Sequence, residues 1–226
     1  MRGSNWLPAL RLLGLVLLGL FLIYLVPYRM NAYRIFQASM MAVGGYTSAI
    51  LMNENDWPFW STIILAGLIA GLLGFLIGIP ALRLTGPYLA IATLAMAIAA
   101  PSLFLHRSVD QWTEGSQGIT IAQPSPPGFL EGVLQADKAD SQWLYFMALF
   151  TAVVMTILAW NIVRSRIGRA FVAIRDSEVA AQAMGISVPR YKTMAFAISA
   201  FFAGIAGGVY TQVVGFVSPF SFNVLL

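Results

Sequence analysis

The residues of this chain that could do chemistry are few, and they lie outside its long apolar segments. The chain has no cysteine and 1 histidine, His106, which lies beside Arg107. A metal site needs several converging ligands, so we expect neither a metal nor a cofactor. The apolar segments hold no paired catalytic groups, and the chain has no G-x-x-x-x-G-K-[ST] loop for ATP. These absences indicate that the chain is not itself an enzyme.

The polar side chains that remain gather in one stretch, residues 164–192. It holds six of the 13 lysine and arginine residues. Its apolar residues fall on two helical faces, one of Ile167, Phe171 and Ile174, the other of Val179, Ala183 and Met184. This pattern is typical of an ordered, basic, amphipathic loop, and it favours a docking partner on the cytoplasmic side.

The composition indicates a membrane protein, because 59% of the residues are hydrophobic and only 10% are charged. The net charge of +4 does not indicate nucleic acid, since the basic residues flank apolar segments and set orientation instead. The first run, 12–27, could be a secretory signal. No suitable cleavage site follows promptly, so an uncleaved span is favoured. We expect a multi-pass protein of the plasma membrane in contact with membrane lipid.

About six apolar segments approach the ~20 residues that a helix needs to cross a bilayer. They cover residues 8–27, 35–52, 59–79, 87–105, 143–163 and 194–215. The predicted fold is therefore all-α, a polytopic transmembrane helix bundle that forms one domain over residues 1–226. Spans two to six contain no Asp, Glu, Lys, Arg or His. Uphill transport would then draw its energy from outside this membrane domain.

The loops alternate in charge, which predicts their sides of the membrane. Basic residues mark 28–34, 80–86 and 164–193 as cytoplasmic by the positive-inside rule. The acidic loop 53–58 and the long loop 106–142 are then external.

Three pairs of glycines are spaced as GxxxG, which lets helix backbones approach closely in lipid. The pairs are Gly67 and Gly71, Gly74 and Gly78, and Gly204 and Gly208. Plain helix packing is the favoured interpretation, and a mobile packing seam is the alternative.

The basic loop should itself contain two short helices. The first is expected over 165–175, and Asp176 is a plausible N-cap for a second over 177–184. Gly185 suits the position after that helix, where a left-handed conformation is needed, and Pro189 prevents continuation.

The second short helix has two possible roles. The small residues Ala180, Ala181 and Ala183 would let a partner surface approach closely. Alternatively, the helix lies on lipid headgroups with its arginines facing phosphate. The Ala-Ala-x-x-x-Gly spacing at 180–185 favours the partner, because it resembles the coupling loop of ABC-transporter permeases, which inserts a short helix into the ATPase subunit.

A longer resemblance narrows the family. The run SRIGRAFVAIRDSEVAAQAMGISVPRYKTMAFAISAFFAGIAGGVY, residues 165–210, is similar to the permeases of branched-chain amino-acid ABC importers. PALRLTGPYLAIATLAM at 80–96 and WTEGSQGI at 112–119 resemble segments of the same family. The match at 165–210 is long and free of gaps, which makes the resemblance specific.

The resemblance implies a permease subunit that imports branched-chain or similar neutral amino acids by alternating access, driven by ATP. Its implied partners are ABC ATPase subunits, a second homologous permease and a periplasmic substrate-binding protein. Loop 164–193 would be the cytoplasmic coupling loop, with ATPase-coupling residues Asp176, Ser177, Glu178, Ala180, Ala181, Gly185 and Pro189. The tentative substrate pathway comprises Gly86, Pro87, Tyr88 and Thr93. An ordinary helix start with an aromatic anchor remains the alternative for residues 86–88.

Two other functions stay open: a permease for urea or short amides, and a membrane scaffold remnant that transports nothing. The family normally continues through further spans, so we expect the chain to be incomplete at its C-terminus and unable to support uptake by itself. On that view, the surface at 204–208 lacks the helix that normally packs on it.

Overall fold

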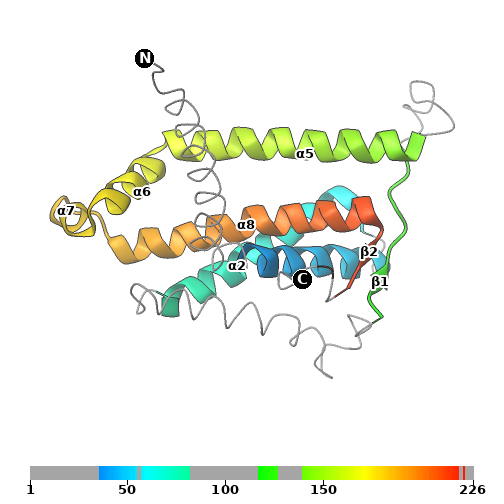
Figure 1. The fold of residues 1–226 in the computed structure, drawn as a ribbon, viewed down its shortest axis with the longest axis horizontal. Helices are drawn as coiled ribbons and strands as arrows, with labels where there is room; N and C mark the ends of the chain where they lie inside the picture. Colours follow the sequence, from blue (N-terminus) through cyan, green and yellow to red (C-terminus); the bar gives the residue numbers. More distant parts are fainter. Residues whose placement is uncertain (1–35, 55–56, 82–116, 127–138, 219–220, 222–226) are drawn as a thin grey trace, which may run out of the picture.

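The computed structural model describes residues 36–54, 57–81, 117–126, 139–218 and 221. These residues form a bundle of long helices with a helical hairpin at one end and a two-stranded sheet at the other (Figure 1). The first helix covers 36–54. The labelled elements that follow are α2 (Phe59–Ala81), β1 (Ile119–Thr120), α5 (Ala139–Arg164), α6 (Arg166–Asp176), α7 (Glu178–Ala183), α8 (Val188–Val214) and β2 (Phe216–Val217).

The predicted all-α fold is confirmed. Within the described residues, α2, α5 and α8 are each long and apolar enough to cross a membrane. Helix 36–54 coincides with the predicted second span, 35–52. The predicted spans 8–27 and 87–105 lie outside the described residues.

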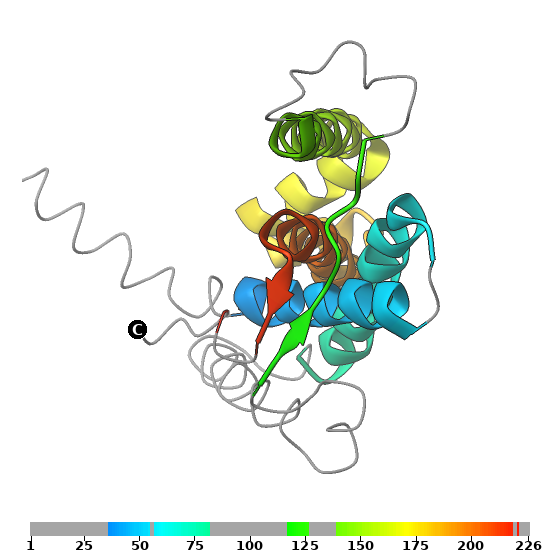
Figure 2. The ribbon, with the colours of Figure 1, turned by 90° about the vertical axis from the view of Figure 1, so that its right-hand side faces the viewer.

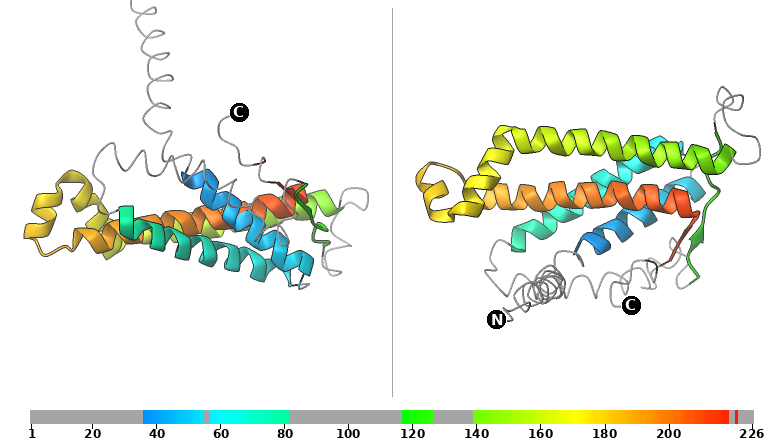
Figure 3. Two further views of the ribbon diagram at one scale, coloured as in Figure 1. Left: turned by 90° about the horizontal axis from the view of Figure 1, so that it is seen from below. Right: turned by 45° about the horizontal axis from the view of Figure 1, so that its top comes forward.

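Helix 36–54, α2 and α8 form the tightly packed core, and they meet through glycines (Figure 3). A methyl group added at Gly44 would lie 2.1 Å from the carbonyl oxygen of Gly204. One added at Gly207 would lie 1.9 Å from the carbonyl oxygen of Met41. Backbones therefore touch directly at these crossings, which lets main-chain atoms supply the van der Waals contacts that hold helices together in lipid.

The six glycines of the GxxxG pairs all lie where α2 and α8 pack against each other. On α8, an added Cβ at Gly204 would lie 2.4 Å from Cβ of Ala70, and one at Gly208 would lie 3.3 Å from Cβ of Ala66. The expectation that the 204–208 surface lacks a packing partner is therefore wrong, because α2 already covers it.

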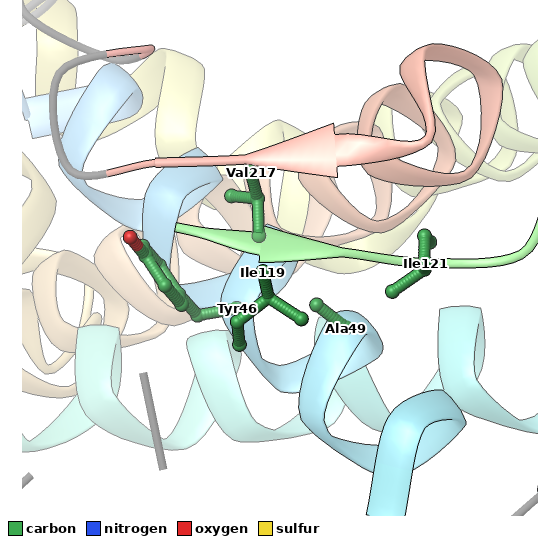
Figure 4. Close-up of a cluster of buried hydrophobic side chains, with 5 residues drawn as sticks. All are labelled: Tyr46, Ala49, Ile119, Ile121 and Val217. Carbon is green, nitrogen blue, oxygen red and sulfur yellow. The ribbon is translucent and has the colours of Figure 1, made fainter. Parts of the chain in front are cut away.

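A small antiparallel sheet closes one end of the bundle, and the sequence analysis did not predict it. Ile119 pairs with Val217. Both side chains are buried, and Figure 4 shows them beside Tyr46 and Ala49 of helix 36–54. Gly215, at φ +73°, ends α8 and turns the chain into β2. A two-residue strand leaves too short a pattern to detect in sequence.

Helix α5 lies beside α8 (Figure 2) and also meets the core at one end, where the Trp143 ring contacts those of Phe59 and Trp60 in α2. Most of its large apolar side chains are exposed, which suits a helix surrounded by lipid or by another subunit. Between α5 and α8 runs an apolar groove with a volume of about 370 Å³, lined in part by Thr151, Met155 and Phe202.

Segments that are predicted to lie on opposite sides of the membrane are found at opposite ends of the bundle. Residues 52–53 and 57–59 line a pocket together with 121–125, so these segments share one end. The α6–α7 hairpin lies at the other end (Figure 1). The described parts of 53–58 and 106–142 thus lie at one end of the bundle and 164–193 at the other, and the assignment of these loops to sides of the membrane stays a prediction.

Candidate functional site

The α6–α7 hairpin begins at a sharp corner after α5. Ser165 caps α6, and its Oγ accepts hydrogen bonds from the backbone N–H groups of Ile167 (3.1 Å) and Gly168 (3.5 Å). The same hydroxyl donates to the carbonyl oxygen of Ile162 at 2.7 Å, so one side chain links the end of α5 to the start of α6. A Cβ at Gly168 would lie 2.0 Å from the carbonyl oxygen of Val163. Only glycine fits so tight a corner.

The cap of α7 is Ser177, so the prediction of Asp176 as N-cap is wrong. Ser177 has an extended backbone, and its Oγ accepts a hydrogen bond from the N–H of Ala180 at 3.2 Å. Asp176 is still helical as the last residue of α6, and its carboxylate accepts from Arg175 Nη2 at 3.0 Å instead. The helix break falls one residue later than predicted, so the serine is the side chain placed to satisfy the free N–H group.

Replacing Ser177 with alanine is expected to fray α7, because the cap hydrogen bond is lost at a cost of about 1 kcal/mol. Hydrogen exchange of the amides of residues 178–183 would report the change as faster exchange. Asp176→Ala is the matched control and should leave those amides nearly as protected as in the unmodified chain. Faster exchange in the Asp176 variant alone would show that the Asp176 carboxylate, and not the Ser177 hydroxyl, caps α7.

Gly185 ends α7 in the conformation that the sequence predicts. Its φ is +81°, its N–H donates to the carbonyl oxygen of Gln182 at 2.9 Å, and the N–H of Ile186 donates to that of Ala181 at 3.0 Å. These two bonds define a Schellman motif, which satisfies the last carbonyls of the helix. The stop is therefore built into the backbone.

Pro189 lies in the first turn of α8 and not at the end of α7. The sequence analysis treated it as a residue that blocks continuation of α7, but Gly185 already ends that helix. Pro189 lies in the first turn of α8, which begins at Val188 and so starts earlier than the predicted span 194–215. Proline suits this position, because its fixed φ is already helical and its missing N–H would have had no partner.

The exposed face of α7 is apolar. Val179 is 79% exposed and Met184 is 83% exposed. Ala180 and Ala183 are exposed as well, but Ala181 is only 3% exposed. The expectation that all three alanines share an open face is therefore corrected at Ala181, which lies on the inner side of the helix because successive residues are rotated by about 100°.

Two contacts hold the hairpin against the start of α8. Lys192 Nζ lies 2.6 Å from Glu178 Oε1 and joins α8 to α7. The rings of Phe171 in α6 and Tyr191 in α8 meet edge to face, with centroids 6.1 Å apart. The hairpin thus contacts α8 through both of its helices.

A buried polar cluster joins the three core helices toward their opposite end, and sequence reasoning missed it. The side chain of Gln212 in α8 is fully buried. Its Nε2 donates to Ser48 Oγ at 3.1 Å and to Thr62 Oγ1 at 2.9 Å, so it bridges helix 36–54 and α2. A glutamine inside an apolar span was the available signal, since such side chains bond across helices in membranes.

The structure brings together the loop residues from Asp176 to Pro189 and, separately, the six packing glycines. It does not test the predicted solute path, because Gly86, Pro87, Tyr88 and Thr93 lie outside the described residues. His106 lies outside them as well. Within the part of the chain that is described, no group of three or more His, Cys, Asp or Glu side chains could hold a metal ion.

Long apolar helices, glycine packing and an exposed capped hairpin define a multi-pass membrane protein with an ordered helical hairpin at one end of its bundle. Residues 4–226 match the family described as "Branched-chain amino acid transport system / permease component". The chain belongs to this family, whose members are transport permeases of the bacterial inner membrane.

Several curated relatives support this assignment. The chain is 38% identical over 199 residues to the high-affinity branched-chain amino acid transport system permease protein LivM of Escherichia coli, covering 80% of this chain and 46% of the relative. Identity to LivM of Salmonella typhimurium is 37% over the same length, with the same coverage. The autoinducer 2 import system permease protein LsrC of Salmonella choleraesuis is 29% identical over 154 residues, which cover 68% of this chain and 38% of that protein. The chain thus spans less than half the length of these relatives. No solved structure matches.

Proposed function

We propose that this chain belongs to the permease subunit of an ATP-driven ABC importer and docks an ATPase subunit through the α6–α7 hairpin. The observation that carries the proposal is the exposed apolar face of α7, with Val179 and Met184 open to solvent on a helix capped at both ends. Large exposed apolar side chains on an ordered element typify an interaction surface. The proposed coupling residues are those predicted from the sequence; Ala181 would support the hairpin from its buried side, and Pro189 would help to start α8.

The mechanism follows from how the hairpin is held. ATP-driven closure of the ATPases would push α7, and the Lys192–Glu178 pair and the Phe171–Tyr191 contact would pass that push to α8. Helix α8 packs backbone to backbone on α2 and on helix 36–54, so it moves them as a unit. Such a rigid-body shift between two packings is one physical form of alternating access. The chain needs no ATP site of its own in this scheme.

The proposed solutes are branched-chain or similar neutral amino acids, and the named LivM relatives support this. The LsrC relatives carry a different import name, so membership of the wider family does not by itself fix the substrate. Urea or a short amide remains the second candidate, and a scaffold without transport the third. The proposed partners are the ATPases, a second homologous permease and a periplasmic substrate-binding protein.

The domain assignment is proposed together with this function. Residues 1–226 would form one transmembrane permease domain, with 106–142 as its external loop and 164–193 as its cytoplasmic coupling loop. Gly86, Pro87, Tyr88 and Thr93 remain the proposed contributors to the solute path.

One set of experiments tests both the association of the chain with the ATPase and the identity of the transported solute. Purify the tagged chain with and without the ATPase subunits of a branched-chain amino acid system, and measure ATP hydrolysis. The chain alone should hydrolyse no ATP and should retain the ATPase on an affinity column. In proteoliposomes that hold the complete transporter, with this chain carried in a permease extended to the length of its LivM relatives, ATP should drive uptake of labelled leucine, and excess valine should compete while urea should not. Competition by urea alone would favour the amide permease, and association without any uptake would favour the scaffold.

The orientation is tested separately with single cysteines, because the native chain has none. Introduce Met184→Cys, at an 83% exposed position, and Ser125→Cys, at the other end of the bundle, in separate variants. In intact cells, a membrane-impermeant thiol reagent that reaches the periplasm should label the Ser125 variant and not the Met184 variant. The reverse pattern would show that the assigned orientation is wrong.

A further inference from the structure

The corner between α5 and α6 carries a set of basic side chains that the proposed docking does not use. Arg164, Arg166 and Arg169 are all exposed. None of them has a carboxylate partner within 4 Å among the described residues. By contrast, Arg175 pairs with Asp176, and Lys192 pairs with Glu178. Three unneutralised guanidinium groups at the corner, one at the end of α5 and two in the first turn of α6, form a strong positive field at this part of the surface.

The corner holds these side chains in a fixed arrangement. Arg169 Nη1 donates to the carbonyl oxygen of Arg164 at 3.2 Å, across the break between the two helices. The capping bonds of Ser165 and the close approach of Gly168 to Val163 fix the backbone on both sides of that break. The arginines are therefore presented together by an ordered backbone.

An apolar strip on α5 leads directly to this basic corner. Ile157, Trp160 and Arg164 are spaced by three and four residues, so they lie one above another on the same helical face. Ile157 is 55% exposed and Trp160 is 58% exposed. The guanidinium carbon of Arg164 lies 4.3 Å from the centre of the Trp160 ring. Tryptophan beside arginine at the end of an apolar helix marks the level of the lipid headgroups.

We propose that this corner is a binding site for an anionic phospholipid. The guanidinium groups of Arg164, Arg166 and Arg169 bind the headgroup phosphate, since arginine presents paired N–H donors that match phosphate oxygens. An acyl chain lies along Ile157 and Trp160. The apolar strip favours a lipid over a free phosphate, because inorganic phosphate has no acyl chain to pack against Ile157 and Trp160. The site is separate from the tip of α7 and does not depend on an ATPase.

The experiment titrates the purified full chain with phosphatidylglycerol or phosphatidylcholine in detergent and measures bound lipid by native mass spectrometry. Arg164→Gln with Arg169→Gln is compared with Arg175→Gln with Arg190→Gln, a control that removes the same charge elsewhere in the loop. Each arginine near an anionic headgroup is expected to contribute about fivefold in affinity. The corner variant should therefore bind phosphatidylglycerol about 25-fold more weakly, and the control variant should change little. Phosphatidylcholine binding should be the same in both variants.

Two further measurements separate a lipid site from a general charge effect. Trp160→Ala should weaken phosphatidylglycerol binding although every charge is kept, and inorganic phosphate at millimolar concentration should not displace the lipid. Equal losses in the corner and control variants would overturn the proposal. Displacement by inorganic phosphate, with no effect of Trp160→Ala, would assign the corner to free phosphate instead.

Discussion

Valine in place of Gly207 is expected to prevent the three core helices from packing. The Cβ alone would lie 1.9 Å from the carbonyl oxygen of Met41 and 2.9 Å from the backbone nitrogen of Gly45. The contact is with backbone, so it cannot be relieved by a change of side-chain rotamer; α8 and helix 36–54 must separate. We expect a loss of about 3 kcal/mol in the free energy of unfolding, the upper end of the usual cost of overpacking.

Ala206→Val provides the matched control for that substitution. Ala206 is the neighbouring residue on α8, but it is exposed and lines the groove toward α5. The thermal stability of both variants would be measured in detergent as the temperature at which half of the monodisperse peak is lost, and the Gly207 variant should lose it at the lower temperature. Equal stability of the two variants would mean that helix 36–54 and α8 do not meet through their backbones.

Aspartate at both Val179 and Met184 is expected to abolish association with the ATPase. Both side chains are mostly exposed in the chain alone, so the fold should not change. In the complex, two carboxylates would be buried in an apolar contact without partners, which is far costlier than losing the contact. Two central contacts of at least about 2 kcal/mol each predict association weaker by a factor of about a thousand or more.

Co-purification and surface plasmon resonance with the ATPase subunit measure this loss. Val179→Ile with Met184→Leu is the control, because it keeps both side chains apolar and of similar size, and it should bind nearly as well as the original chain. Undiminished binding by the aspartate variant would leave a helix lying on the lipid surface as the better account of α7.

Long apolar runs in the sequence predicted most of the described helices. An apolar run of about 20 residues fixes a helix wherever it lies, which is why α2, α5 and the core of α8 were predicted. Gly185 was predicted correctly because a positive φ after a helix nearly requires glycine. Asp176 was predicted wrongly as the cap because the choice between adjacent Asp and Ser depends on where α6 ends. The structure places that boundary at Asp176, one residue beyond the predicted end of the first short helix.

Contacts between distant parts of the chain could not be predicted from patterns. Gln212 bonds to Ser48, which is 164 positions away in the sequence, and to Thr62, which is 150 positions away. The β1–β2 pairing joins segments that are closer in sequence but still distant, Ile119 with Val217 and Thr120 with Phe216, with only two residues of each strand in register. The burial of Ala181 depends on how α7 is seated against its neighbours. In each case the deciding fact is a tertiary contact, which one sequence without its fold does not contain.

The length of α8 has a consequence for how the protein sits in the bilayer. Its 27 residues span about 40 Å, against about 30 Å of hydrocarbon. An upright α8 would therefore raise its first turns, which carry Arg190 and Lys192, about 10 Å clear of the acyl chains; a tilted one would bring them closer. Lys192 pairs with Glu178 of the hairpin at that end, so under the proposed docking the thickness of the host bilayer would influence the height at which α7 meets the ATPase.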